Sequence, residues 1–212
     1  MTETIKLYTW PTPNGIKVSI ALEELGLDYE AVPVNIIEGE QFDPEFLAIS
    51  PNGKIPAIVD GDTALMESGV ILLYLAEKTG QLVPRYGTPE YWTMLQWLMW
   101  QMAHFGPMLG QAHHFLKFNP GESEYAESRY RVEAARLYRV LDTRLEARDY
   151  VADQLSIADI AIWGWASRFD YQQIDLHDYP NVMRWYLKLA DRPAFQRGYA
   201  VPADAGPIPR PD

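Results

Sequence analysis

Short apolar runs alternate with helical stripes over the first part of the chain. One stripe has the i, i+3, i+4, i+7 spacing of an amphipathic helix: Val18, Ala21, Leu22 and Leu25. The expected elements, in order, are a strand at 5–9, a loop at 11–15, this helix up to Gly26, a strand at 29–34, a helical turn at 46–49, strands after Pro56 and at 64–66, and a helix from Glu67 to Gly80. This β-α-β-α-β-β-α order predicts a single mixed sheet with helices on its faces.

Strand signals stop after the linker-like run at 84–89, and long helical patterns take over. The first covers 90–104 and is expected to break or bend at Gly106–Pro107. Later helices are marked by Ala134, Leu137, Tyr138, Leu141 and Leu145, by the capping-box-like Ser156 and Asp159, by Val182, Trp185, Tyr186 and Leu189, and by Pro193. We therefore predict an α/β domain at 1–84, a linker at 85–89, an all-α domain at 90–200 and a loosely held, proline-rich tail at 201–212.

A loop at 52–56 stands out because Pro56 directly precedes an apolar run. Proline gives no N–H to a sheet, so Pro56 either opens a strand or forms a cis bond with Ile55 that turns neighbouring backbone groups toward a ligand. Glu67 and Ser68 then begin a helix, and helix N-termini attract anions. A backbone clamp beside an anion site would suit a peptide-like ligand that carries a carboxylate.

Charge and composition narrow the class of protein. The chain has 212 residues, 18 Lys and Arg against 29 Asp and Glu, and a net charge of −11 without a basic run. We expect no binding to nucleic acid or anionic membranes. No apolar run approaches the ~20 residues of a membrane span, and the N-terminus leads straight into a strand, so we expect a soluble, cytoplasmic protein. The chain contains no cysteine, which excludes disulfides, thiolate metal sites and a protein thiol nucleophile.

Most standard catalytic motifs are missing. The sequence contains neither a dinucleotide or phosphate-binding glycine loop nor a Gly-x-Ser-x-Gly elbow. On a regular helix, His104 and His113 would lie on opposite faces, and His113 and His114 would diverge, so we expect structural roles for the histidines and no metal site. Trp92, Trp97 and Trp100 are expected in the core, with a hydrophobic pocket as the alternative.

Several spaced motifs together resemble the cytosolic glutathione transferases over essentially the full length. They are the first strand with its 12–15 loop, the run 22–30, the loop 52–56, the pair at 67–68 and the segment 156–159. The loops 12–15 and 39–42 and the stretch 106–115 are most similar to the bacterial Nu class, the glutathione-dependent disulfide-bond reductases. The resemblance implies a thioredoxin-like domain followed by an all-α helical bundle domain (the glutathione transferase fold) and a homodimer.

The resemblance also assigns residues to glutathione. Pro56 matches a cis proline, and the backbone of Ile55, in the Asn52–Pro56 loop, matches the group that pairs with the cysteinyl part. Glu67 and Ser68 match the pair that holds the γ-glutamyl end. The other carboxylate is assigned to Gln41 and Lys54, and the second glutathione to Arg129. Without the resemblance, Gln41 could be an ordinary loop residue, Lys54 and Arg129 solvated charges, and Glu67 and Ser68 only a helix start.

Thr12 and Asn14 occupy the place where better-known classes carry a Tyr, Ser or Cys. A hydroxyl or amide N–H can donate to a thiolate and lower its pKa, so both are candidate catalytic residues. Tyr8 is the alternative donor, although its place within the strand favours a core role. Disulfide reduction without a protein cysteine would use two glutathiones in turn. Conjugation of glutathione to a small electrophile held against Trp97, Trp100 or His104, and a binding module without turnover, are the alternative functions.

Overall fold

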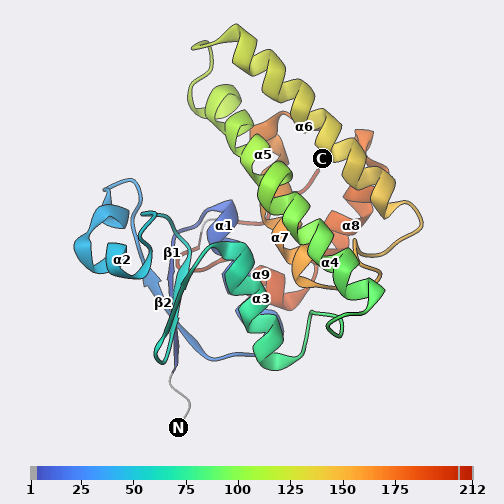
Figure 1. The fold of residues 1–212 in the computed structure, drawn as a ribbon. Helices are drawn as coiled ribbons and strands as arrows, with labels where there is room; N and C mark the ends of the chain where they lie inside the picture. Colours follow the sequence, from blue (N-terminus) through green and yellow to red (C-terminus); the bar gives the residue numbers. More distant parts are fainter. Residues whose placement is uncertain (1–3, 205, 212) are drawn as a thin grey trace. The chain divides into compact units, whose positions relative to one another are not determined.

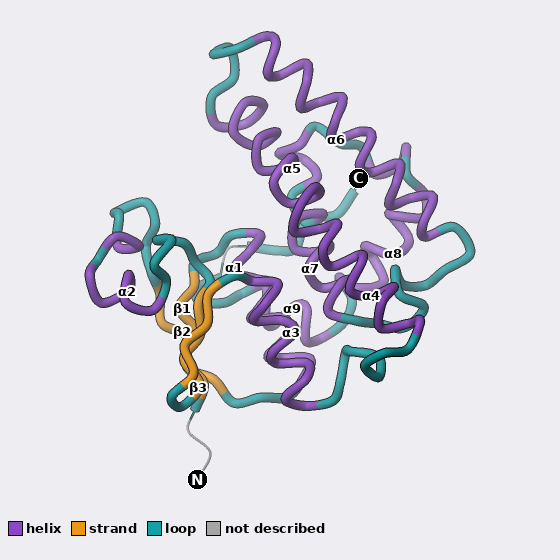
Figure 2. Tube along the Cα trace, in the orientation of Figure 1, coloured by secondary structure: helices purple, strands orange, loops and turns teal. Residues whose placement is uncertain are grey.

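The computed structural model describes residues 4–204 and 206–211 of the chain. Contacts within the chain divide it into two compact units. The first contains the described residues up to Val83 together with those of Asp191–Ile208, and the second contains Pro84–Ala190 with the described residues from Pro209 onward. Strands are confined to the first unit, apart from an isolated bridge between Ala152 and Gln154, and the second is helical (Figure 2).

The first unit is built on a mixed sheet, as its sequence pattern predicts. Its strands are β1 (Ile5–Thr9), β2 (Tyr29–Pro33), β3 (Ala57–Asp60) and β4 (Thr63–Met66), in the order β2-β1-β3-β4. Only the β1–β2 pair is parallel. Helices α1 (Pro13–Leu25) and α3 (Ser68–Thr79) lie on one face of the sheet, and α2 (Pro44–Ile49) lies on the other (Figure 1).

Helix α1 begins earlier than expected. The prediction that 11–15 lies outside any helix is wrong from Pro13 onward, because proline fits the first helical position, where its missing N–H costs nothing. Thr12 is the N-cap, and its side-chain oxygen accepts a hydrogen bond of 3.1 Å from the Gly15 N–H. Gly26 ends the helix in the left-handed conformation, as predicted.

Helix α9 (Pro193–Tyr199) begins at the expected proline, but it packs against α1 in the first unit. The Ser19 hydroxyl donates to the Gly198 carbonyl over 2.6 Å, and a Cβ on Gly198 would come within 2.6 Å of the Ile20 backbone. Arg192 and Arg197 pair with Glu24 and Glu23 of α1. The range 90–200 predicted for the helical domain therefore includes a helix that the contacts join to the sheet unit.

Apart from that bridge, the regular elements of the second unit are helical among the residues that the structure describes. Its elements are α4 (Pro89–Trp100), the π-helical turn η2 (Gln101–Phe105), α5 (Gly106–His113), the π-helical turn η3 (His114–Phe118), α6 (Glu124–Leu145), α7 (Ile157–Ala166), the short 3-10 turns η4 (Phe169–Gln172) and η5 (Leu176–Asp178), and α8 (Pro180–Ala190). The helical backbone continues through Gly106–Pro107, because the π turn directly before them tolerates the absence of an N–H at Pro107.

The predicted apolar stripes of α6 and α8 form the core of this unit, and each of their residues is buried. His113 also lies there, where it accepts a hydrogen bond of 3.0 Å from the Gln172 amide. Burial lowers the pKa of His113 to about 4, so this imidazole is neutral at physiological pH. The structural role expected for the histidines therefore fits His113, whereas His104, His114 and His177 are exposed.

Within residues 4–204 and 206–211, no helix is long and apolar enough to cross a membrane.

The proline-rich tail is held at Pro209, because the Tyr186 hydroxyl donates a hydrogen bond of 2.6 Å to the Pro209 carbonyl.

Asp159 ties the start of α7 to the rest of the helical unit. One carboxylate oxygen accepts from the Val151 N–H (2.9 Å) and the Trp185 indole (3.0 Å), and the other accepts from the N–H (3.1 Å) and hydroxyl (3.0 Å) of Ser156. Burial raises the pKa of Asp159 to about 6, so the carboxylate is mainly ionised at neutral pH and accepts all four bonds.

We predict that Asp159→Ala lowers the free energy of unfolding by about 3 kcal/mol, since it leaves buried donors without an acceptor. Asp159→Asn retains one carbonyl oxygen and should lose less. Urea unfolding measures both changes, with Asp170→Ala, an exposed carboxylate of the same unit, as the control expected within about 0.5 kcal/mol of wild type. Equal stability of Asp159→Ala and the control would contradict this role.

Candidate functional site

The strand register brings three loops to one edge of the sheet. Tyr8 of β1 pairs with Ala57 of β3, which pairs with Met66 of β4. These pairs are antiparallel, so the end of β1, the start of β3 and the end of β4 lie at the same edge. Thr12 follows β1, Pro56 directly precedes β3, and Glu67 directly follows β4. Residues that are far apart in the sequence are thereby placed together.

The loop before β3 has the backbone geometry that the resemblance implies. The Ile55–Pro56 bond is cis, and Pro56 is buried. Ile55 is half-buried and packs against the cluster of Val34, Phe46 and Ala57. The Ser50 hydroxyl donates to the Lys54 carbonyl over 2.8 Å, which fixes the loop. The side chains of Asn52 and Lys54 remain exposed.

Gln41 lies beside this loop, in the 3-10 turn η1 (Glu40–Phe42). Gly53 has a φ of 60°, and a Cβ there would come within 3.3 Å of the Gln41 carbonyl and the Phe42 ring. Only glycine therefore allows both this backbone conformation and this close approach. Among the described residues, the buried side-chain oxygen of Gln41 has no hydrogen-bond partner, so a ligand N–H could satisfy it.

Thr12 and Asn14 lie at the first turn of α1. A Cβ on Gly15 would come within 2.2 Å of the Trp10 carbonyl oxygen, so a glycine is needed for the helix to begin this close to β1. Both side chains are partly exposed. Tyr8 instead packs in the apolar cluster, with its ring centre 6.1 Å from that of Phe46, which favours the core role expected for it.

Glu67 and Ser68 form the start of α3. Glu67 has a φ of 71°, which is uncommon for a residue other than glycine and is often found at functional sites. Its side chain is exposed, whereas Ser68, the first helical residue, is only 4% exposed. The N-terminus of this 12-residue helix carries the positive end of the helix dipole. The pair therefore offers a carboxylate for a cation and a helix end for an anion.

The structure adds Lys17, which the sequence reasoning missed. Its side chain is 1% exposed, and its ammonium lies 3.4 Å from the Ser68 hydroxyl oxygen. The sequence carries a signal for its burial, because Lys17 is flanked by the apolar residues Ile16 and Val18. Lysine is rarely buried to this extent.

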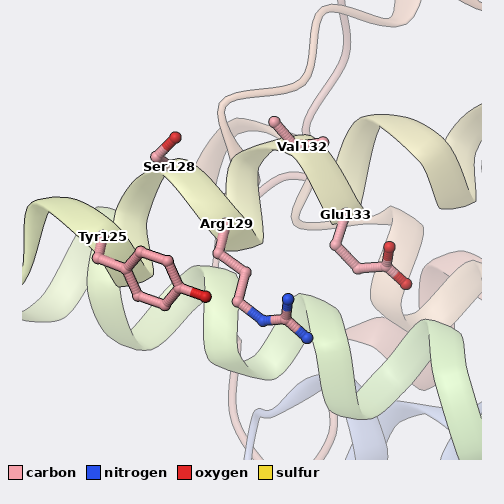
Figure 3. Close-up of a pocket in the computed structure, with 5 residues that line it drawn as sticks. All are labelled: Tyr125, Ser128, Arg129, Val132 and Glu133. Atoms are coloured by element: carbon pink, nitrogen blue, oxygen red, sulfur yellow. The ribbon is translucent and has the colours of Figure 1, made fainter.

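Arg129 belongs to the second unit. It lines a cavity of about 340 Å³ along α6, together with Tyr125, Ser128, Val132 and Glu133. Tyr125, Arg129 and Glu133 project from one side of the helix (Figure 3). The Arg136 guanidinium holds the pKa of Glu133 below its usual range through bonds of 2.7 and 2.8 Å. Arg129 itself is exposed, and its part in a glutathione site stays a prediction.

The tryptophans expected in the core are divided. Trp97 is buried and has its ring centre 5.0 Å from that of the half-buried Trp100, whereas Trp92 is 52% exposed.

Among the residues that the structure describes, no group of three or more His, Asp or Glu side chains could hold a metal ion.

The residues at the sheet edge can bind an extended, anionic peptide. The Ile55 backbone lies before the cis Pro56 and offers polar groups to a peptide chain. The Glu67 carboxylate and the start of α3 could hold a peptide end that carries both an ammonium and a carboxylate. Thr12 and Asn14 supply a hydroxyl and an amide at the same edge. These groups can donate hydrogen bonds to a developing anion and so stabilise it.

Comparison with known proteins agrees with this geometry. Residues 3–77 match the family model of the glutathione S-transferase N-terminal domain, and residues 124–187 match that of the C-terminal domain. The chain is 51% identical to the Disulfide-bond oxidoreductase YfcG of Escherichia coli, over 90% of this chain and 92% of the relative. It is 40% identical to the Disulfide-bond oxidoreductase YghU of the same organism, over 96% and 77%.

Solved structures agree as well. A glutathione transferase from Pseudomonas putida, with one glutathione disulfide bound per subunit, has a TM-score of 0.91 and 43% identity over 95% of this chain and 93% of its own. One from Burkholderia graminis, with two glutathione molecules per subunit, has a TM-score of 0.89 and 43% identity over 94% and 89%. The chain therefore belongs to the glutathione S-transferase family, with the thioredoxin-like sheet and the helical domain of that fold.

Proposed function

We propose that the protein is a glutathione-dependent disulfide-bond reductase that uses two bound glutathiones. The observation that carries the proposal is the arrangement of Thr12, the cis Pro56 and Glu67 at one edge of the sheet, in a chain without cysteine. The names of the two Escherichia coli relatives and the glutathione disulfide or glutathione pair in the neighbouring structures support it. Because glutathione is the reductant, we also place the protein in the cytoplasm.

Binding of the first glutathione follows the shape of the site. The Ile55 backbone, which the cis Pro56 follows, pairs with the cysteinyl part of the tripeptide. Glu67 and Ser68 hold the γ-glutamyl end. The glycyl carboxylate is bound from the 41–54 side by Gln41 and Lys54, with Asn52 in the same loop. The close approach of Gly53 to the Gln41 carbonyl supports this grouping.

The reaction consists of two thiol-disulfide exchanges. Hydrogen bonds from Thr12 and Asn14 stabilise the first glutathione as a thiolate. Its sulfur attacks one sulfur of the substrate disulfide, forms a mixed disulfide and releases the other half as a thiolate. The second glutathione, as a thiolate, attacks the glutathione sulfur of the mixed disulfide and releases the remaining substrate thiolate. One substrate disulfide is reduced to two thiols, and two glutathiones are oxidised to one glutathione disulfide.

Thr12→Asp tests the thiolate contact. Aspartate keeps the acceptor that caps α1 but replaces a donor with a negative charge. We predict a fall in kcat/KM for a small symmetrical disulfide of about 100-fold, an upward shift of the thiol pKa in the pH–rate profile, and unchanged thermal stability. Asn14→Ala should lose about tenfold. Thr12→Ser and Tyr8→Phe are the controls and should keep most of the rate. A Tyr8→Phe loss larger than that of Thr12→Asp would transfer the role to Tyr8.

Arg129 is proposed to bind a carboxylate of the second glutathione, and its exposed place in the α6 cavity supports this. We predict that calorimetric titration gives two glutathiones per subunit, and that Arg129→Gln weakens the second by about tenfold. Arg131→Gln is the matched control, because Arg131 does not line the cavity and bonds to Gln173. Equal second-site affinities in the two variants would remove Arg129 from the site.

We further propose a homodimer, as the family resemblance implies. Each unit exposes large hydrophobic side chains: Met66 and Val70 in the first, and Trp92, Met99 and Val132 in the second. Where such side chains form a contiguous patch they mark a subunit interface, so these residues are the candidates. Light scattering on the eluting protein should give about twice the chain mass of 24.3 kDa. A mass of one chain at micromolar concentration would refute the dimer.

Conjugation of glutathione to a small hydrophobic electrophile held against Trp97, Trp100 or His104 is the second candidate, because Trp100 is half-buried and His104 is exposed. The same thiolate would attack the electrophile in place of a disulfide. Faster turnover of an aryl halide than of a small disulfide would favour this function over reduction.

A further inference from the structure

Lys17 is a buried cation next to the start of α3. Its ammonium donates a hydrogen bond of 3.4 Å to the Ser68 hydroxyl oxygen, and the side chain is almost fully buried. Both positions are fixed by regular structure, since Lys17 lies in the first half of α1 and Ser68 is the first residue of α3. The two helices pack against each other.

The surroundings of Lys17 favour a bound anion. A buried ammonium beside the positive end of a helix dipole places two positive charges together. Glu67 acts on Lys17 as an opposite charge, and the Glu67 side chain is itself exposed. A ligand carboxylate at Ser68 would be attracted by both the helix end and the ammonium.

We propose that Lys17 is a positioning residue, whose ammonium is the countercharge for a ligand carboxylate bound at Ser68, so that ligand binding and protonation of Lys17 are coupled. The inference rests on the proposed function, which places the γ-glutamyl end of glutathione at this point. That end carries both a carboxylate and an ammonium. Lys17 and Ser68 bind the carboxylate, and Glu67 binds the ammonium.

The other charged groups around α1 do not replace this role. On the α9 side, Arg192 and Arg197 are closed in ion pairs with Glu24 and Glu23. On α3, Lys78 and Tyr74 bond to Asp60. On β1, Lys6 is exposed and Tyr8 packs on Phe46.

The burial of Lys17 determines how ligand affinity changes with pH. It lowers the pKa of Lys17 to about 7, against the opposing effect of Glu67. Below this pH the free protein already carries the ammonium, whereas above it the ligand must bind together with a proton. Ligand affinity should therefore fall as pH rises above 7. Protein stability without ligand has the opposite trend. The folded pKa lies below the unfolded value, so the cost of the buried charge is full below pH 7 and is relieved as pH rises toward 10.5.

Calorimetry with S-methylglutathione tests the coupling, because this ligand keeps the γ-glutamyl end and lacks the titrating thiol. For the wild type we expect Kd to be roughly tenfold weaker at pH 8 than at pH 6, with uptake of a proton at pH 8. Lys17→Met should bind more weakly at pH 6 and lose most of the pH dependence. Lys6→Met, the same change at an exposed lysine of the same unit, should behave as wild type. Ionisations of the ligand are common to all three proteins and cancel.

The possible failures are distinct. No binding of S-methylglutathione by the wild type would overturn the proposed function and this inference together. Binding with the same pH dependence in wild type and Lys17→Met would overturn the inference alone. If Lys17→Met does not fold, proton uptake by the wild type, measured in buffers of different ionisation enthalpy, decides the question, and no uptake at pH 8 overturns the inference. A folded Lys17→Met should be at least as stable as wild type at pH 6, because it no longer buries a charge.

Discussion

The antiparallel register of β1, β3 and β4 is the constraint on which the site depends. Tyr8, Ala57 and Met66 form one row across the sheet, so the loops beyond them converge on a single edge. A slip of one residue would turn the side chains of the moved strand to the other face. The register is held by the buried residues Leu7, Ala57 and Ile58, which have no exposed surface. The core of the sheet thus determines the spacing of the loops that carry the chemistry.

The candidate site places local positive charge in an acidic protein. The chain has a net charge of −11, which repels anions at long range. The candidate site counters this with the start of α3 and with Lys17 at 3.4 Å from Ser68. These charges are buried or fixed by the backbone, and salt screens such interactions less than those at the surface. An anionic tripeptide can therefore be bound without a basic surface.

Particular residues show what the sequence could predict. Apolar periodicity predicted the strands and the buried face of α6, because it follows burial. Gly26 predicted the end of α1, because glycine readily adopts the left-handed conformation of a helix cap. The cis bond at Pro56 came from the resemblance, since composition does not distinguish it from a strand start. Periodicity could not reveal that α9 packs on α1, which depends on a glycine at position 198. Lys17 was missed because its partner, Ser68, is 51 residues away.

We propose that two glutathione sulfurs meet at the start of α1 in a protein without a thiol of its own. A crystal structure of the protein soaked with glutathione disulfide tests it most directly. We predict that one half of the glutathione disulfide lies along Ile55 with its γ-glutamyl end at Ser68. The disulfide sulfurs should lie within hydrogen-bonding reach of the Thr12 hydroxyl or the Asn14 amide. A disulfide bound with its sulfurs away from both residues, or a site that accepts only one tripeptide, would contradict it.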